Sequence, residues 1–562
     1  MSDQSRLDLG GTLSRARLRL AEGWRLLRLH GPGQLTFWFI ALMIGIAAGF
    51  AALFFRKGIN WLQQAVYGVD DVRALHSFAE SLPWYMVLFI PVAGGLVVGV
   101  ILHRFTPDGR ARSVADVIEG AAINEGRVEG RAGLASALAS MITLGTGGSS
   151  GREGPVVHLA AVISTKVSKF INANAIHSRD LMGCAVAAAV SASFNAPIAG
   201  ALFALEVVLR HFALHAFAPI VIASAAGTVI TRLEFGNLVE FPRGTDTALE
   251  FYQELPAFLI LGLISGLVAV AFMRAIFWTE DRATALQRRW SVPRYLRPAL
   301  AGLVLGAIAC FYPHIIGVGY ETTISALTGE LLLREAIIFA LIKAAAAAIT
   351  IGGRMGGGVF SPSLMLGALV GLAFGLVATG LFPDVSGSET LYALAGMGAV
   401  AAAVLGAPIS TTLIVFELTG DWQTGLAVMV AVSLSTALAS KMVEHSFFLT
   451  QLERRNIHLA AGPQAYLLAM FTVTRVMRPM DHDRAAPEEA LRTLIDQGIF
   501  IEPQKTLESA MPIFEKTALD FIPVVRLEDG SSEPVLDGAL FQVDALKAYN
   551  KALAATAAEE HG

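Results

Sequence analysis

Charged residues are scarce in this chain. Lys, Arg, Asp and Glu together make up 16% of the 562 residues, whereas soluble domains carry roughly 25%. Hydrophobic residues make up 54%. About a dozen apolar stretches recur along the sequence, and several approach the roughly 20 residues that span a bilayer. This composition excludes an ordinary soluble domain and predicts a polytopic membrane protein.

Cysteine is nearly absent as well. Cys184 and Cys310 both lie in apolar runs, so we interpret them as small buried hydrophobic residues and not as disulfide partners or metal ligands. Because metal-ligand clusters and activated nucleophiles are also lacking, we expect no metal, no cofactor and no enzyme. A cleavable signal peptide is not expected, since the first apolar run is long enough to remain as an anchor. The net charge of −4 identifies no partner, and no nucleic-acid partner is expected.

What the chain does contain is an internal repeat. Two segments with related sequences are APIAGALFALE at 196–206 and APISTTLIVFE at 407–417. A second pair, separated by almost the same number of residues, is GGSSGREGP at 147–155 and GGRMGGGVFSP at 352–362. Repeats with glycine-broken apolar segments at matching positions are typical of transporters that bind their substrate near the bilayer midplane. The sequence therefore predicts a membrane transport protein.

The glycine-rich segments predict an anion site. A helix that begins at a glycine-rich turn presents unpaired N–H groups and a partial positive charge, and glycine permits close approach of a ligand. Two such helix starts, one from each repeat, are expected to point at one another and hold an anion. The alternative is that the glycines only allow close helix packing, which leaves Arg152 and Glu153 at the break unexplained. A phosphate loop is disfavoured, because no Gly-Lys-Ser/Thr follows the glycines.

Glu153 is the most informative single residue. A carboxylate within a membrane segment is expensive and indicates a functional role. At a site that binds anions it is itself a tethered anion, so it can occupy and block the site until protonation neutralises it. One group would then gate anion passage and carry a proton. The alternative is a helix-capping glutamate exposed in a loop.

Three motifs, in order, resemble the CLC family of chloride channels and chloride/proton exchangers. GREGP at 151–155 matches the family signature that carries its gating glutamate, FNAPIAG at 194–200 matches FNAPLAG, and GGVFSP at 357–362 matches GGxFxP. The resemblance covers about residues 30–455. It implies an all-α membrane fold of about eighteen helices in two inverted halves. It also implies a homodimer with a separate pore in each subunit.

The resemblance also assigns candidate site residues. Glu153 is expected to be the external gate. The backbone N–H groups of Val359 and Phe360 are expected to line a central anion site. Those of Arg152, Glu153 and Gly154 are expected to contribute to an outer anion site.

Two departures from the family pattern concern the central site. The family's central anion also meets a serine hydroxyl, which survives here as Ser113 without the surrounding glycines and proline. It further meets a tyrosine hydroxyl, where this chain has Phe448. Phenylalanine donates no hydrogen bond, so we expect weaker halide binding or greater reliance on backbone N–H groups. Asp116 either adds a negative charge near the inner mouth or caps a helix.

A third departure concerns protons. Exchangers in the family commonly carry a second glutamate directly after the one matched by Glu206, and it serves as the internal proton acceptor. Here that position is Val207, which cannot hold a proton and therefore favours passive chloride conduction. The alternative is a chloride/proton antiporter in which Glu206 or water delivers protons to Glu153. Glu206 and its repeat mate Glu417 can also be structural, by pairing with Arg210 or capping neighbouring helices.

Loop charges and composition predict the organisation of the chain. Arginine-rich loops place both termini in the cytoplasm of a protein that lies in the inner cell membrane. We expect a cytoplasmic segment at 1–34, with an amphipathic surface helix or a plain solvated helix at 12–29. Membrane halves are expected at 35–250 and 251–456, followed by a small cytoplasmic α/β domain at 457–562.

The segment 457–562 resembles cystathionine-β-synthase-type (CBS) regulatory domains over about one unit. Asp544 stands where nucleotide-binding units have a ribose-contacting aspartate, but Phe541 replaces the Ser or Thr that precedes it. We expect a structural tail that supports dimerisation at least as readily as a nucleotide site. A membrane-anchored nucleotide sensor is the alternative to anion transport for the chain as a whole.

Overall fold

The structure is a computed structural model that describes most of the chain. The described residues are 33–69, 74–212, 214–236, 254–419, 422–457, 459, 468, 471–526 and 535–560. The predicted amphipathic helix at 12–29 and the predicted boundary between membrane halves near residue 250 lie outside the described residues.

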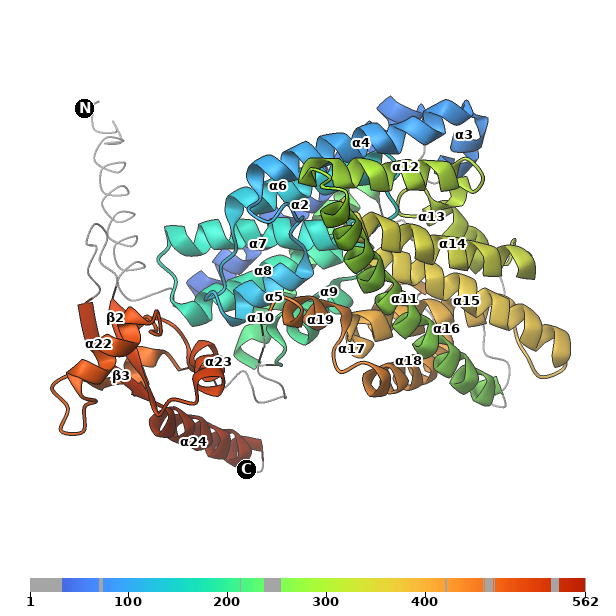
Figure 1. Cartoon of the computed structure of the whole chain (residues 1–562). Coiled ribbons are helices and arrows are strands. Elements are labelled where there is room, and N and C mark those ends of the chain that lie inside the picture. Colours follow the sequence, from blue (N-terminus) through green and yellow to red (C-terminus); the bar gives the residue numbers. More distant parts are fainter. Residues whose placement is uncertain are drawn as a thin grey trace, which may run out of the picture.

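Membrane-length helices dominate the first four fifths of the chain (Figure 1). Seven helical segments are long and apolar enough to cross a membrane. They are α2 (Gln34–Tyr67), α4 (Trp84–Phe105), α10 (Leu214–Phe235), α11 (Leu255–Arg289), α14 (Leu333–Gly352), α15 (Phe360–Leu381) and the segment Thr424–Glu453, which contains most of α18 (Trp422–Met442). The predicted all-α polytopic fold is confirmed.

Shorter helices fill the space between these spans. They are α3 (Leu75–Ser81), α5 (Val114–Ala122), α6 (Gly130–Gly145), α7 (Glu153–Phe170), α8 (Ala175–Phe194), α9 (Pro197–Phe203), α12 (Arg297–Ala309), α13 (Tyr320–Leu327), α16 (Glu389–Leu405), α17 (Pro408–Thr419) and α19 (Phe447–Glu453). With the longer helices they make eighteen α-helices within the described residues up to 457, as the family resemblance implies. Backbone that breaks at membrane depth is tolerated where protein surrounds it, and α7, α8 and α16 are mostly buried.

Close packing of helices requires glycine at several contacts. On α4, a Cβ at Gly99 would overlap the backbone oxygen of Tyr295, and on α12 a Cβ at Gly302 would overlap the backbone oxygen of Pro91. Small residues allow backbones in a membrane to approach at such contacts. Close packing therefore explains these glycines, which lie outside the two glycine-rich motifs.

The repeated API motifs break the chain in the same way in both halves. Helix α8 is followed by Asn195 with φ of 56°, and α16 is followed by Gly406 with φ of 67°. Each left-handed residue stops its helix, and the proline that follows two residues later begins the next helix, at Pro197 and Pro408. Proline suits this position because its fixed φ matches the first helical turn.

The C-terminal region forms a small α/β domain, as predicted (Figure 1). Its antiparallel sheet has the order β1-β3-β2. The strands are β1 (Arg478–Pro479), β2 (Phe521–Arg526) and β3 (Val535–Phe541), and the helices are α21 (Val473–Val476), α22 (Glu488–Asp496), α23 (Leu507–Thr517) and α24 (Gln542–Glu560). Val473, Leu507, Phe514, Ile522 and Leu540 are buried at its centre. The CBS resemblance of this domain stays a prediction.

Helix α23 contacts the membrane part directly. The Nη1 atom of Arg179 lies 3.3 Å from Oε2 of Glu508, and both side chains are buried. Ser509 donates its hydroxyl to the backbone oxygen of Ile123, at the end of α5. Arg179 also donates to the backbone oxygen of Leu209, at 2.9 Å. The C-terminal domain is therefore anchored to two elements that reach the candidate site.

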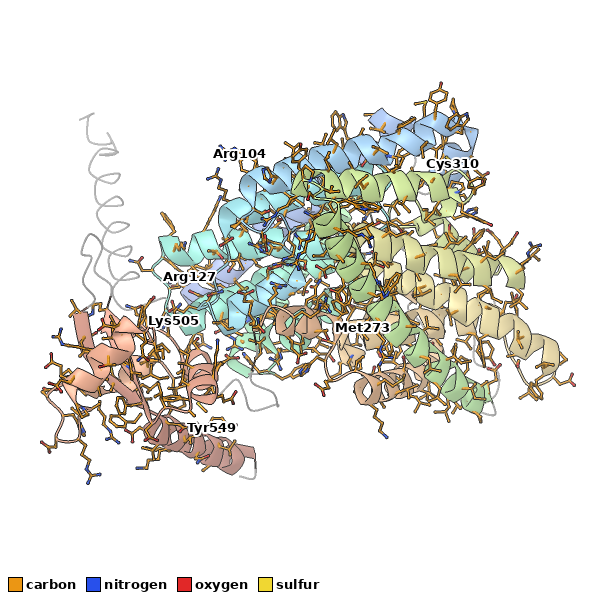
Figure 2. The ribbon with its side chains drawn as sticks, in the orientation of Figure 1. Arg104, Arg127, Met273, Cys310, Lys505 and Tyr549 are labelled. Atoms are coloured by element: carbon orange, nitrogen blue, oxygen red, sulfur yellow. The ribbon has the colours of Figure 1, made fainter. Side chains whose placement is uncertain are left out.

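The two cysteines differ in burial. Cys184 is fully buried in α8, as predicted. Cys310 is only partly buried, which corrects the expectation of a buried residue. It directly follows the last residue of α12, at the end of that helix, and its Sγ lies 3.4 Å from the backbone oxygen of Trp84 (Figure 2).

Candidate functional site

The two glycine-rich segments meet at one place. The N–H of Gly151 donates to the oxygen of Gly358 at 2.7 Å, and the N–H of Gly358 donates to the oxygen of Gly151 at 2.8 Å. This antiparallel bridge joins residues that are about two hundred positions apart in the sequence. Because α7 begins two residues after one bridge residue and α15 two residues after the other, both helix starts face the same region.

Both helices begin with backbone N–H groups that the helix itself does not use. The first hydrogen bonds within the helices run from Val156 to Arg152 and from Ser363 to Val359. The N–H groups of the preceding residues in each helix have no intrahelical partner. A proline occupies the third helical position in both, so only the cap and the first two positions supply donors. The site can thus hold an anion without a full positive charge.

Glu153 is the first residue of α7, and its side chain is 2% exposed. Its Oε1 accepts a hydrogen bond from the hydroxyl of Ser361 at 2.6 Å. Its Oε2 is buried without a hydrogen-bond partner among the described residues, and Arg152 Nε lies 3.9 Å from Oε1. The alternative of an exposed capping glutamate is therefore wrong, because the carboxylate lies inside the protein at the meeting point of the two helix starts.

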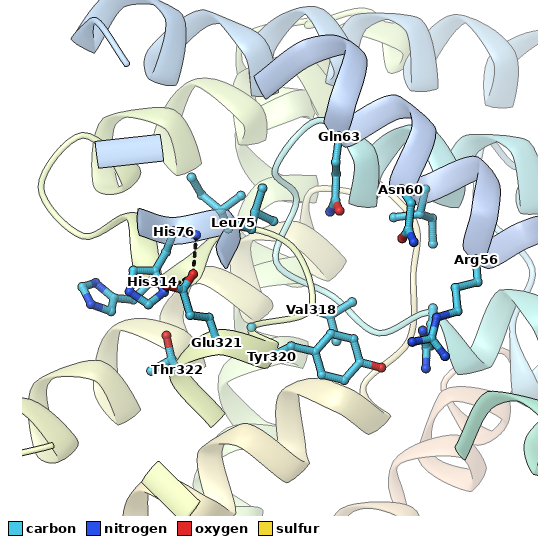
Figure 3. Close-up of a pocket in the computed structure, with 14 residues that line it drawn as sticks. Arg56, Asn60, Gln63, Leu75, His76, His314, Val318, Tyr320, Glu321 and Thr322 are labelled. Carbon is cyan, nitrogen blue, oxygen red and sulfur yellow. Dashed lines mark hydrogen bonds and ion pairs between the residues drawn. The ribbon is translucent and has the colours of Figure 1, made fainter. Parts of the chain in front are cut away.

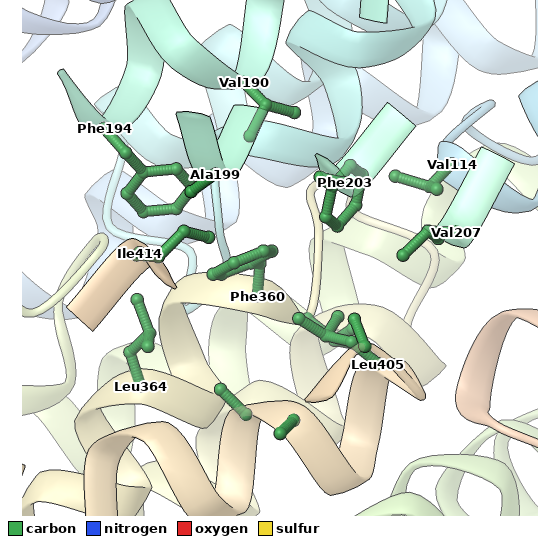
Figure 4. Close-up of a cluster of buried hydrophobic side chains, with 14 of the residues drawn as sticks. Val114, Val190, Phe194, Ala199, Phe203, Val207, Phe360, Leu364, Leu405 and Ile414 are labelled. Carbon is green, nitrogen blue, oxygen red and sulfur yellow. The ribbon is translucent and has the colours of Figure 1, made fainter. Parts of the chain in front are cut away.

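A cavity adjoins this carboxylate, and we call it the central cavity. It is lined by six of the predicted site residues: Ser113, Glu153, Gly154, Val359, Phe360 and Phe448. The ring of Phe360 packs against Phe194 and Phe203, with centroid distances of 4.7 and 5.9 Å (Figure 4). The cavity therefore combines an apolar wall with helix-start N–H groups, an environment that suits a weakly hydrated anion.

Arg152 lines a second, separate cavity. Its guanidinium donates to the backbone oxygen of Ser193 at 2.7 Å and lies over the ring of Tyr320. In the same cavity Glu321 accepts a hydrogen bond from the backbone N–H of His76 at 2.9 Å (Figure 3). Arg152 and Glu153, although adjacent in the sequence, therefore line different cavities.

Asp116 caps α5, the helix that begins after Ser113. The backbone N–H of Ser113 donates to Asp116 Oδ2 at 2.8 Å. Arg110 and Arg455 also lie 2.6 and 3.1 Å from the Asp116 carboxylate. The capping alternative is thus confirmed. The negative charge of Asp116 is largely balanced, because the cavity that it lines also contains both arginines together with Arg112.

Glu206 and Glu417 each cap a helix that belongs to the other repeat. The Glu206 carboxylate accepts the N–H groups of Ile409 at 3.0 Å and Ser410 at 2.8 Å, at the start of α17. The Glu417 carboxylate accepts the N–H groups of Ile198 at 3.0 Å and Ala199 at 2.7 Å, at the start of α9. The structural alternative, in the form of helix capping, is confirmed for both glutamates. Val207 follows in the π-helix η2 (Ala204–Leu209) and is buried.

Two polar residues of the site are missing from the sequence-based prediction. Ser361 occupies the position that matches Gly154 in the other repeat, and its hydroxyl reaches Glu153. Gln451 lies one helical turn after Phe448 and lines the central cavity. The signal for Ser361 is a hydroxyl residue at a helix start, and the signal for Gln451 is its i+3 spacing from Phe448.

Comparison with known proteins agrees with the motifs. Residues 94–440 match the family described as Voltage gated chloride channel. The putative chloride channel protein ClcB-like of Ralstonia nicotianae is 32% identical, over 70% of this chain and 91% of the relative. The voltage-gated ClC-type chloride channel ClcB of Escherichia coli is 28% identical, over 73% of this chain and 97% of the relative.

Solved structures show the same fold. A slow cyanobacterial Cl−/H+ antiporter superposes with a TM-score of 0.67 at 21% identity, over 75% of this chain and 98% of the other. A eukaryotic CLC transporter superposes with a TM-score of 0.64 at 18% identity, over 93% of this chain and 98% of the other. The matched segment covers more than half of the chain, and the first relative is more than 30% identical, so the chain belongs to the CLC family.

Proposed function

We propose that this protein moves chloride and similar small anions across the inner membrane along a path that the Glu153 carboxylate gates. The single observation that carries this proposal is the buried position of that carboxylate. It lies where two helix starts meet and lines the central cavity, with Oε2 unpartnered among the described residues.

Electrostatics explains why the carboxylate would act as a gate. Two unit negative charges about 4 Å apart repel by about 4 kcal/mol at an effective dielectric constant of about 20. An ionised Glu153 and a bound anion therefore exclude each other from the same helix starts. Protonation of the carboxyl group, or its movement out of the site, would admit the diffusible anion.

We infer passive conduction as the mode of transport. Val207 cannot accept a proton, and the neighbouring Glu206 carboxylate is engaged by two backbone N–H groups of α17. Both oxygens of the Glu206 carboxylate are thus held at the start of α17. The relatives described as chloride channels support this mode. Chloride/proton exchange, with Glu206 or water as the proton route, is the alternative.

The test uses purified protein in liposomes with an outward chloride gradient, recorded with chloride and pH electrodes. Chloride efflux without proton movement supports passive conduction, whereas uphill proton movement driven by chloride would establish exchange. Glu153→Gln is expected to make efflux independent of pH. The exposed residue Glu80 on α3 offers the matched control Glu80→Gln. Efflux of Glu153→Gln with the wild-type pH dependence would refute the gate.

We also propose a homodimer with cytoplasmic termini, in which each subunit has its own anion path and residues 457–562 form a supporting tail. The apolar side chains of Ile198 and Ile409, on the capped helices α9 and α17, are 59% and 48% exposed. In the tail, Arg478 lies 2.6 Å from the Asp544 carboxylate, so the aspartate already has a partner other than a nucleotide. Removal of 462–562 is expected to leave anion flux intact. Loss of flux together with measurable nucleotide binding to the full chain would favour a nucleotide sensor instead.

A further inference from the structure

We propose that Gln451 is an anion ligand of the central cavity, where its side-chain amide donates a hydrogen bond to the transported anion. The inference rests on the proposed anion transport and deepens it by naming a side chain that holds the anion. It follows from the placement, burial and chemistry of this one residue.

Gln451 and Phe448 lie on the same face of α19. They are three residues apart, which brings side chains together on a helix. Both line the central cavity with Val359 and Phe360, whose N–H groups stand at the start of α15. The side chain of Gln451 therefore borders the same space as the helix-start donors.

The amide has an unused hydrogen-bonding position. Oε1 of Gln451 is buried and has no hydrogen-bond partner within the described part of the chain. A buried polar atom without a partner is costly. A half-turn about the last side-chain torsion, which is broad for glutamine, exchanges this oxygen with the NH2 group. The same position then presents two donors to an anion that enters the cavity.

Few other side chains in the cavity are able to do this. Among the described residues that line it, Phe447 and Phe448 donate no hydrogen bond, and Glu153 repels an anion when ionised. Ser113 supplies a hydroxyl at the start of α5. Gln451 is therefore the side chain that adds a neutral donor from the α19 side of the cavity.

A neutral donor also suits transport better than a cation. Conduction requires an ion to bind favourably enough to enter and weakly enough to leave. A lysine or arginine in this cavity would hold the anion by a full charge, whereas an amide adds a directional hydrogen bond. Gln451 would thereby increase affinity without trapping the anion.

The experiment measures chloride binding by isothermal titration calorimetry, with the purified full chain in detergent. Gln451→Leu keeps the approximate size and removes both donors. Because hydrogen bonds to charged groups are among the stronger ones, chloride binding is expected to weaken about tenfold or more. Gln451→Glu, which adds a second negative charge, is expected to weaken it further.

A second variant separates ligation from a structural role. Phe448→Tyr combined with Gln451→Leu places a phenol on the same face of α19, and it is expected to restore most of the lost affinity. Thr450→Val is the matched control, since the Thr450 hydroxyl donates to the backbone oxygen of His445 and does not line the cavity. It is expected to bind chloride as the wild type does.

Three outcomes would overturn the proposal. Equal chloride affinity of the wild type and Gln451→Leu would overturn this inference alone. Weakened binding that Phe448→Tyr fails to restore would assign Gln451 a structural role. Absence of chloride binding to the wild type would instead overturn the proposed function, and this inference with it.

Discussion

The hydrogen bond that Ser361 donates to Glu153 stabilises the carboxylate in the position where it would block the proposed anion site. Ser361→Ala removes a donor that lies 2.6 Å from Oε1 of a carboxylate that is almost fully buried. Hydrogen bonds to charged groups contribute about 1.5–3 kcal/mol. Since about 1.4 kcal/mol corresponds to a factor of ten, the carboxylate should occupy the site about 10- to 150-fold less favourably, relative to conformations in which it has left.

The assay is chloride efflux from liposomes at a fixed pH near neutrality, with chloride binding measured in parallel. A diffusible anion competes with the tethered carboxylate for the same helix starts, so a weaker closed state raises both the efflux rate and the apparent chloride affinity. The upper limit is the behaviour of Glu153→Gln, in which the competing charge is absent. Ser361→Ala is therefore expected to lie between the wild type and Glu153→Gln.

Ser363→Ala is the matched control. Ser363 lies two residues further along α15, is buried, and donates its hydroxyl to the backbone oxygen of Phe360. Its removal leaves the contact with Glu153 intact, so efflux and affinity should stay at wild-type values. Unchanged efflux and affinity in Ser361→Ala, or an equal rise in Ser363→Ala, would refute the reasoning.

The remaining predictions concern docking and packing. Glu508→Lys is expected to release the C-terminal domain, because it opposes Arg179 with a like charge in a buried contact; limited proteolysis checks this, with the exposed Glu515→Lys of α23 as control. Burial raises the pKa of Glu508, although Arg179 lowers it. Docking of the C-terminal domain should therefore be strongest at a pH below the pKa that Glu508 has when the domain is undocked. It should weaken as the pH rises through the higher pKa that Glu508 has in the docked domain. Protease resistance that increases with pH would contradict the role of Glu508 in docking. Gly99→Ala is expected to lower the free energy of unfolding by about 1–3 kcal/mol through overpacking, which a lower thermal unfolding temperature in detergent would reveal. Gly380→Ala is the control, because its Cβ would meet no other atom, and it is expected to leave the unfolding temperature unchanged.

Much of the architecture can be predicted from the sequence, because it depends on the chemistry of neighbouring residues. Apolar composition predicts the membrane setting, and the repeated motifs predict two related halves. Glycine-rich turns followed by proline predict two helix starts, which the structure has at Glu153 and Phe360, since backbone geometry and missing N–H groups are properties of a few neighbouring residues. The fold class, the membership of the family and the meeting of the two helix starts all follow from such patterns.

The tertiary structure decided which groups touch. Ser361 donates to a carboxylate 208 residues away, and Glu206 caps a helix 203 residues away. Local pattern carries no information on such pairs, because a hydrogen bond across the molecule depends on the packing of many helices. The same packing places Gln451 in the wall of the central cavity and directs the guanidinium of Arg152 toward Ser193 and a separate cavity. The sequence by itself predicts an anion site at two helix starts, because that prediction depends on a few neighbouring residues, whereas only the packed structure decided which side chains lie at those helix starts and which connect them to the C-terminal domain.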